Sequence, residues 1–152
     1  MIYYGAYGSN MSISQMEIRC PKAKLLDKGI LEGYELTFRG RLNNAHATIQ
    51  RSAKKNPLCG VPIVIWEISK SDEANLDRYE GYPYYYHKEY HEVTLKEGKK
   101  LVMLYVMNSG YNYNLPSPMY CCTIGDGYTE HRYDIHYLIN SIEKVRKLKM
   151  EC

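Results

Sequence analysis

No stretch of this sequence is hydrophobic for long enough to cross a membrane as a helix. The longest apolar runs, residues 61–66 and 101–107, fall far below the roughly 20 residues that a bilayer requires. The first residues also lack a basic region followed by a long apolar one, so we expect no secretory signal. We therefore expect a cytoplasmic protein that has no membrane partner.

An excess of charge of one sign is absent as well. The 20 basic and 17 acidic residues are mixed along the chain and leave a net charge of +3. Nucleic-acid binding usually requires a clustered basic surface, so we expect no nucleic-acid partner. The five cysteines are an odd number and include the adjacent Cys121 and Cys122, which suits neither a disulfide framework nor a zinc site. We expect them to be reduced.

Phenylalanine and tryptophan are scarce, and tyrosine takes their place. The chain has one Phe and one Trp against 17 Tyr. A tyrosine combines an apolar ring with a hydroxyl that needs a hydrogen-bond partner when it is buried. Many of these rings should therefore lie between core and surface, or line a polar pocket.

Length and hydrophobic pattern predict one domain of the α+β class. The 152 residues show no repeat and no linker, so we expect a single domain over residues 1–152. Apolar patterns predict strands at residues 2–7, 34–38, 47–50, 58–68, 86–95 and 101–107. Helices are predicted from a capping box at Ser14 to Pro21, over residues 69–79 with a stop near Gly81, from Ser117-Pro118, and over residues 135–145. Strands in the middle with helices between them indicate a small barrel or a strongly bent sheet, and Pro62 indicates an edge position or a bulge.

Three familiar kinds of site find little support. His87 and His91 lie four residues apart on a predicted strand, about 13 Å from each other, which is too far to share one metal ion. Ser9 is a candidate nucleophile, but the G-x-S-x-G pattern is absent. Cys121 and Cys122 are candidate reactive thiols, although free cysteines are more often small buried hydrophobic residues.

Two other stretches are more informative. Gly8-Ser9-Asn10 lies between a predicted strand and a predicted helix; Gly and Asn tolerate a positive φ, and successive N–H groups in such a turn can bind an anion. The alternative is an ordinary turn. Glu80 ends a predicted helix and is followed by Gly81 and a run of tyrosines. Aromatic rings around a carboxylate would raise its pKa toward the range of acid–base catalysis. The alternative is a solvated glutamate at the end of a helix.

Taken together, these stretches resemble the γ-glutamylcyclotransferase family, with its γ-glutamylamine cyclotransferases and AIG2-like proteins. The resemblance covers most of the chain. It is carried by residues 4–11 with the sequence Y-G-A-Y-G-S-N-M, by Arg19-Cys20-Pro21 and Ala23, by Ala47-Thr48-Ile49, by Leu76-Asp77 with Glu80-Gly81, and by residues 116–120. Y-G-S-N followed at this distance by L-D-x-x-E-G is a specific combination. His46 and residues 126–132 have no assigned part in this pattern.

The resemblance implies a small mixed β-barrel with flanking helices and a pocket at the Y-G-S-N loop. It also implies an enzyme that releases 5-oxoproline and a free amine or amino acid from a γ-glutamyl compound. In that reading Glu80 is the catalytic acid/base, and the γ-glutamyl group is held by Tyr7, Gly8, Ser9 and Asn10, with Tyr120 and Tyr86 as candidate walls.

The implied reaction is intramolecular: the substrate's α-amine attacks its own γ-carbonyl, so the protein needs no nucleophile. No metal, nucleotide or flavin is required, and the expected partner is a small γ-glutamyl molecule. Two alternatives stay open: a non-catalytic module that binds a γ-glutamyl or sugar-like ligand, and an acyltransferase that passes the γ-glutamyl group to an external amine. The leaving amine is also open, as is a homodimer.

Overall fold

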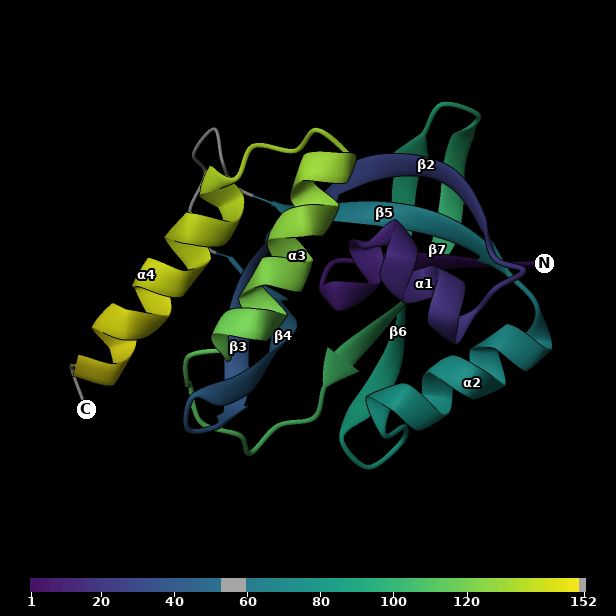
Figure 1. Cartoon of the computed structure of the whole chain (residues 1–152). Helices are drawn as coiled ribbons and strands as arrows, with labels where there is room; N and C mark the ends of the chain where they lie inside the picture. The colour runs from purple at the N-terminus through teal and green to yellow at the C-terminus, as the bar shows by residue number, and fades with distance from the viewer. Residues whose placement is uncertain (53–59, 151–152) are drawn as a thin grey trace.

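The computed structural model describes residues 1–52 and 60–150. Its strands and helices alternate in the manner of an α+β protein, with most strands in the middle of the chain (Figure 1). Along the chain they are β1 (Ile2–Ala6), a single 3₁₀ turn η1 (Ser9–Met11), α1 (Ile13–Arg19), β2 (Lys24–Leu31), β3 (Tyr34–Arg41), β4 (Asn44–Arg51), β5 (Val61–Ile68), α2 (Lys70–Glu80), β6 (Tyr86–Leu95), β7 (Gly98–Met107), α3 (Pro118–Glu130) and α4 (His136–Met150). None of the described helices is long and apolar enough to cross a membrane.

A mixed five-stranded sheet in the order β2-β5-β1-β7-β6 forms the centre of the molecule. The strand β1 lies in its middle, antiparallel to β5 and parallel to β7. At Gly5 the strands pack so closely that a Cβ atom would lie 2.7 Å from the Leu104 side chain and 2.8 Å from that of Val102. The Y-G-S-N loop therefore leaves the sheet at its centre.

A separate hairpin, β3–β4, completes the strands, and the expected barrel is not closed by hydrogen-bonded ladders. Among the described residues, β2 and β6 are the two edges of the sheet. These edges approach each other through the Lys96 amide, which donates to the Asp27 carboxylate at 2.9 Å, and through Val93, which lies against Gly29. The hairpin contacts the sheet through the Met107 amide, which donates to the Thr48 hydroxyl at 3.0 Å. The described strands thus form a mixed five-stranded sheet and a hairpin, and they do not show a closed barrel.

Local chemistry sets the ends of the helices, as expected for α2 and α3. Ser69 and Asp72 form a reciprocal capping box at the start of α2, and Gly81 ends it at φ 65°. Ser117 caps α3, with Pro118 in its first turn. The prediction for α1 was wrong in detail: Ser12, and not Ser14, caps the helix, because its hydroxyl accepts a hydrogen bond from the Gln15 amide.

Two predictions about strands also need correction. The strand β2 was not predicted, because its sequence KLLDKGIL is largely exposed and has no regular alternation. The strand β5 lies inside the sheet, between β2 and β1, so Pro62 is not on an edge strand. It is tolerated near the start of β5 because the pairing with β1 ends at Val64. Residues 58 and 59 of the predicted strand lie outside the described residues.

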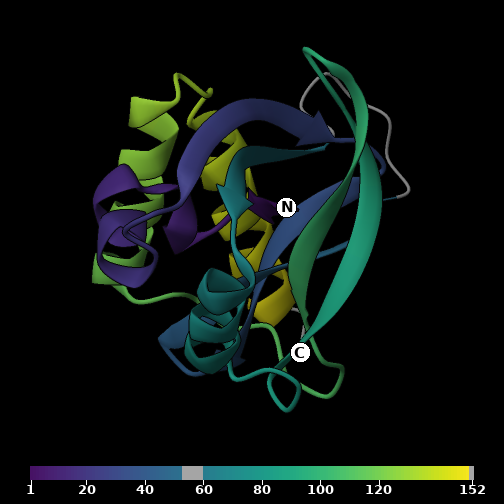
Figure 2. The ribbon, with the colours of Figure 1, turned by 90° about the vertical axis from the view of Figure 1, so that its right-hand side faces the viewer.

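Two of the helices, α1 and α3, lie together on one side of the molecule (Figure 2). Figure 2 shows α1 and α3 on the side opposite to the long β6–β7 ribbon. The helix α3 packs on the turn η1 so tightly that a Cβ atom at Gly127 would lie 2.7 Å from the Met11 side chain. The buried His131 hydrogen-bonds the Met11 carbonyl at 2.8 Å. Residues 126–132, which had no assigned part in the sequence pattern, thus support the Y-G-S-N loop.

Candidate active site

A cavity of about 350 Å³ lies where the end of β1, the end of α2 and the start of α3 meet. The six residues predicted from the sequence all line it: Tyr7, Gly8, Ser9, Asn10, Glu80 and Tyr120. Tyr86, the further candidate wall, lines it as well. The fold therefore brings together residues that are up to 113 positions apart in the chain, from Tyr7 to Tyr120.

A glycine fits at position 8 because there is little room for a side chain, and not because the backbone has a positive φ. Its φ is −113°, and neither Gly8 nor Asn10 has the positive φ that the sequence allowed. A Cβ atom at Gly8 would lie 3.2 Å from the Tyr120 hydroxyl and 3.4 Å from the Ala47 side chain. A glycine here keeps the bare backbone of the loop next to the Tyr120 hydroxyl.

Both polar atoms of the Asn10 side chain hydrogen-bond other residues of the protein. Its Nδ2 donates to the Tyr4 hydroxyl at 2.9 Å, and its Oδ1 accepts from Arg19 Nη1 at 2.6 Å. Its carbonyl accepts from the indole of Trp66 at 3.0 Å. The buried side chain of Asn10 therefore positions Tyr4 and Arg19.

Three tyrosine hydroxyls fix the walls of the cavity by bonding to the backbone. Tyr7 donates to the carbonyl of Tyr105, and Tyr86 donates to the carbonyl of Ala47 at 2.6 Å. Tyr120 instead accepts from the amide of Ala47 at 3.1 Å. The Tyr120 hydroxyl hydrogen therefore has no acceptor among the described residues, and it remains available to a ligand.

Glu80 is the last residue of α2, and its backbone is held by the Gly81 cap. The residue is half-buried, and its carboxylate makes no hydrogen bond or ion pair with the described part of the chain. Burial raises the pKa of Glu80 from 4.5 to about 7, against a smaller lowering by the charge of Arg19. A carboxylate with this pKa can both accept and release a proton near neutral pH.

The cavity also contains residues that sequence reasoning did not assign. His46 on β4 hydrogen-bonds the Tyr85 hydroxyl through Nδ1 at 2.9 Å, and burial lowers the pKa of its imidazole. Arg19 at the end of α1 brings a permanent positive charge to the lining. Arg19 belongs to a recognised sequence motif, but its position beside Asn10 depends on the fold, so only the motif could have indicated it.

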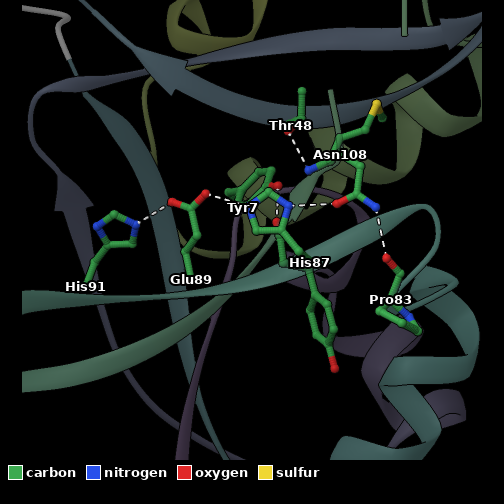
Figure 3. A network of polar contacts seen from close by, with 9 residues as sticks. Tyr7, Thr48, Pro83, His87, Glu89, His91 and Asn108 are labelled. Carbon is green, nitrogen blue, oxygen red and sulfur yellow. Dashed lines mark hydrogen bonds and ion pairs between the residues drawn. The ribbon is translucent and has the colours of Figure 1, made fainter. Parts of the chain in front are cut away.

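The other candidate sites lie elsewhere or lack an activating neighbour. His87 and His91 hydrogen-bond different oxygens of Glu89, at 2.7 and 3.0 Å, in a network outside the lining of the cavity (Figure 3). Ser9 lies in the cavity, where its hydroxyl accepts from Arg19 at 3.4 Å and hydrogen-bonds no basic side chain of the described residues. Burial raises the pKa of the Cys121 thiol, which disfavours the reactive thiolate. Within residues 1–52 and 60–150, no group of three His, Cys, Asp or Glu is placed to hold a metal ion.

These features define a small α+β protein with a partly buried acid–base group in a tyrosine-lined cavity. A family model described as "Gamma-glutamyl cyclotransferase, AIG2-like" matches residues 4–122. The γ-glutamylcyclotransferase of Bos taurus is 29% identical over 147 residues, which cover 92% of this chain and 78% of that protein. The solved structure of a γ-glutamyl cyclotransferase has a TM-score of 0.78 at 27% identity, over 95% of this chain and 86% of that chain. An uncharacterized protein of Homo sapiens gives 0.77 at 28% identity with the same coverage.

The chain belongs to the γ-glutamyl cyclotransferase, AIG2-like family. The resemblance read from the sequence is thereby confirmed, and so is the α+β fold of that family.

Proposed function

We propose that this protein is a γ-glutamyl cyclotransferase, which releases 5-oxoproline and a free amine or amino acid from a γ-glutamyl compound. The observation that carries the proposal is the Glu80 carboxylate, which lines the cavity without a partner and has its pKa raised to about 7. Membership of the family supports the same reaction class. Glu80 is then the general base and general acid of the reaction.

The reaction forms one C–N bond and breaks another. The substrate's α-amine attacks the γ-carbonyl carbon, and Glu80 takes a proton from that nitrogen. The tetrahedral intermediate then collapses: the bond to the leaving nitrogen breaks, and Glu80 returns the proton to that nitrogen. No external reactant is needed, because nucleophile and electrophile belong to one molecule and the cavity has only to fold that molecule.

The remaining lining residues have roles in this proposal. The bare backbone at Gly8 and Ser9 accommodates the γ-glutamyl group, with the ring of Tyr7 as a wall and Asn10 holding the loop in place. The free hydroxyl hydrogen of Tyr120 lies next to Gly8 and is a donor for the developing oxyanion. Bonding to the backbone fixes this donor before a ligand enters, which is what makes such a group effective.

The test is incubation with γ-glutamyl compounds whose leaving groups are an amino acid, a polyamine, a lysine side-chain amine or a natural-product amine. We expect 5-oxoproline, read by mass spectrometry, from at least one of them. The N-acetylated form of that substrate should give none, because its α-nitrogen can no longer attack. Release of 5-oxoproline from the N-acetylated compound would contradict the intramolecular mechanism.

The same experiment separates the alternative functions. A new amide formed on addition of an external amine would identify an acyltransferase. Binding of the γ-glutamyl compounds without any 5-oxoproline would identify a non-catalytic module.

A further inference from the structure

The guanidinium group of Arg19 is held rigidly at the lining of the cavity. Its Nη1 donates to Asn10 Oδ1 at 2.6 Å and to the Ser9 hydroxyl at 3.4 Å. Its Cζ lies 4.6 Å from the centre of the Tyr79 ring, a cation–π distance. Two residues of the Y-G-S-N loop and one of α2 thus fix the orientation of this cation.

The held guanidinium still has unused donors. Nε is buried and lacks a partner, and Nη2 has no hydrogen bond to the described residues and is not among their buried atoms. Arg19 lines the cavity as well as a neighbouring surface groove, so a ligand in the cavity lies beside a guanidinium group that has unused donors. An arginine normally offers five N–H donors in a planar fork that fits a carboxylate.

Arg19 and Glu80 line the same cavity without forming an ion pair. The charge of Arg19 lowers the pKa of Glu80, yet no contact between the two side chains is within ion-pair distance. Elsewhere the partly buried acids Glu73 and Asp77 are both paired with Lys88. A cation and an anion that face one small cavity unpaired are complementary to a ligand that carries both charges.

An α-amino acid group is such a ligand, and the γ-glutamyl group ends in one. We propose that Arg19 binds the α-carboxylate of the substrate and so directs the α-amine toward Glu80. This inference rests on the proposed function, to which it adds a residue that recognises the α-amino acid group of the substrate. Arg19 is placed to do so because Ser9 and Asn10, which orient it, belong to the loop that accommodates the γ-glutamyl group.

The test compares two substrates that differ at one group: a γ-glutamyl amide with a free α-carboxylate, and the same compound as its α-carboxamide. Wild-type protein should prefer the carboxylate by roughly 10- to 100-fold in kcat/KM, the usual worth of a hydrogen bond to a charged group. Arg19→Gln should lose this preference by slowing the carboxylate substrate alone. Arg19→Lys, which keeps the charge and loses the fork, should fall between the two.

The matched control is Arg78→Gln. Arg78 lies exposed on α2, hydrogen-bonded to Asn75, and lines a neighbouring surface groove but not the cavity. It should keep the wild-type preference. A second pair of substrates carries the carboxylate or the carboxamide on the leaving group instead. For this pair, the ratio of the two kcat/KM values should be the same in wild type and in Arg19→Gln.

Binding of the same α-carboxylate and α-carboxamide compounds, measured by calorimetry, separates this inference from the proposed function. Preferential binding of the carboxylate that requires Arg19 supports the inference, even if no 5-oxoproline forms and the proposed function fails. Equal binding of the two compounds by wild-type protein overturns it, whether or not the Arg19 variants fold. An equal loss on both substrates in Arg19→Gln, or a loss that follows the leaving-group carboxylate, overturns it as well.

Discussion

Glu73 and Glu80 lie on the same helix, α2, two turns apart, and their surroundings are opposite. Glu73 accepts from the Lys88 ammonium at 2.8 Å, and Asp77 pairs with the same ammonium at 3.0 Å. The Tyr105 hydroxyl also donates to Asp77, at 2.6 Å. Glu80, one turn further, has no such partner among the described residues. The middle of α2 is thus held to β6 by ion pairs and to β7 by a hydrogen bond, and the carboxylate at its end has neither.

The difference shows how one helix serves two purposes. Side chains of the Lys88 cluster, defined as Lys88, Glu73 and Asp77, are 13–26% exposed, so their charges need one another. The cluster keeps α2 in place. Glu80 is then carried into the cavity by the helix, and its raised pKa is the cost of leaving the carboxylate unpaired there. Charges that hold the fold are paired, and the charge proposed for catalysis is not.

The largest effect should follow from Glu80→Gln. Gln keeps the size of Glu but cannot carry a proton in the useful pH range, so turnover should fall by about 10²–10⁴-fold, the usual worth of acid–base catalysis. The loss should appear in kcat more than in KM, because the proton moves in the transition state. Release of 5-oxoproline measures it. A variant that keeps more than about a tenth of the turnover would rule out this role for Glu80.

The control for that variant has to be chosen with the structure in view. Glu73 looks suitable in the sequence, because it lies in the same helix outside the motif, but its ion pair with Lys88 makes its substitution costly. Glu17 on α1 is exposed and lies outside the cavity lining. Glu17→Gln should change neither turnover nor stability measurably.

The next effect should be on stability, and it concerns the ion pairs of the Lys88 cluster. Lys88→Met leaves Glu73 and Asp77 close together without their cation, and we expect a loss of about 2–4 kcal/mol in the free energy of unfolding. Urea unfolding at pH 7 measures it. A loss below about 0.5 kcal/mol, the range of an exposed pair, would show that the Lys88 cluster does not hold α2.

A smaller effect, of opposite sign, is expected for the unpaired carboxylate. The pKa of Glu80 in the fold is raised from 4.5 to about 7, so ionisation costs nothing below pH 4.5, costs progressively more up to pH 7, and costs the full amount above it. Glu80→Gln should therefore be more stable than wild type at pH 8, by about 1–3 kcal/mol, and equally stable at pH 4. Urea unfolding at the two pH values tests this, and equal differences at both would contradict it.

The same pKa sets the pH dependence of activity. The base form of Glu80 is needed for attack, so kcat/KM of wild type should rise as the pH passes through about 7. A profile that is already flat above pH 5 would place the essential base elsewhere.

The smallest effect should come from the network of Figure 3, a second paired region. Glu89 accepts from His87 and His91, and its side chain is 34% exposed, so solvent screens the pairs. Glu89→Gln should cost only about 0.2–1 kcal/mol in urea unfolding at pH 6. The turnover should stay unchanged, because His87, Glu89 and His91 lie outside the cavity lining. A clear loss of turnover would show that β6 passes the charge state of this network to the site.

Local chemistry explains which parts of the fold could be predicted. The helix α2 begins after Ser69 and ends before Gly81, because both residues form caps that depend on neighbouring residues alone. The apolar runs of β1 and β7 are long enough to be recognised in the sequence. The strand β2 was missed because its pairing with β5, and not its own pattern, makes it a strand. The open edges β2 and β6 were not predicted either, because the order of strands in a sheet depends on pairing between distant segments, which no short stretch encodes.

The residues of the candidate site likewise fall into those that the sequence could predict and those that it could not. A sequence motif predicted that Glu80 and the Y-G-S-N loop act together, and the cavity contains both. Their roles in catalysis and binding stay predictions. Arg19 and His46 were not assigned, since the partners that place them, Asn10 and Tyr85, are separated from them by 9 and 39 residues.

The backbone of one residue, Ala47 on β4, has a consequence for redesign. Tyr86 from β6 donates to its carbonyl and Tyr120 from α3 accepts from its amide, so this residue joins three elements at the cavity. Any substitution that shifts the backbone of Ala47 would move both rings together, and with them the space beside Gly8. A new ligand preference should therefore be sought at the rim, where Met119 lines the cavity and is 80% exposed. There a side chain can be exchanged without disturbing the backbone of Ala47.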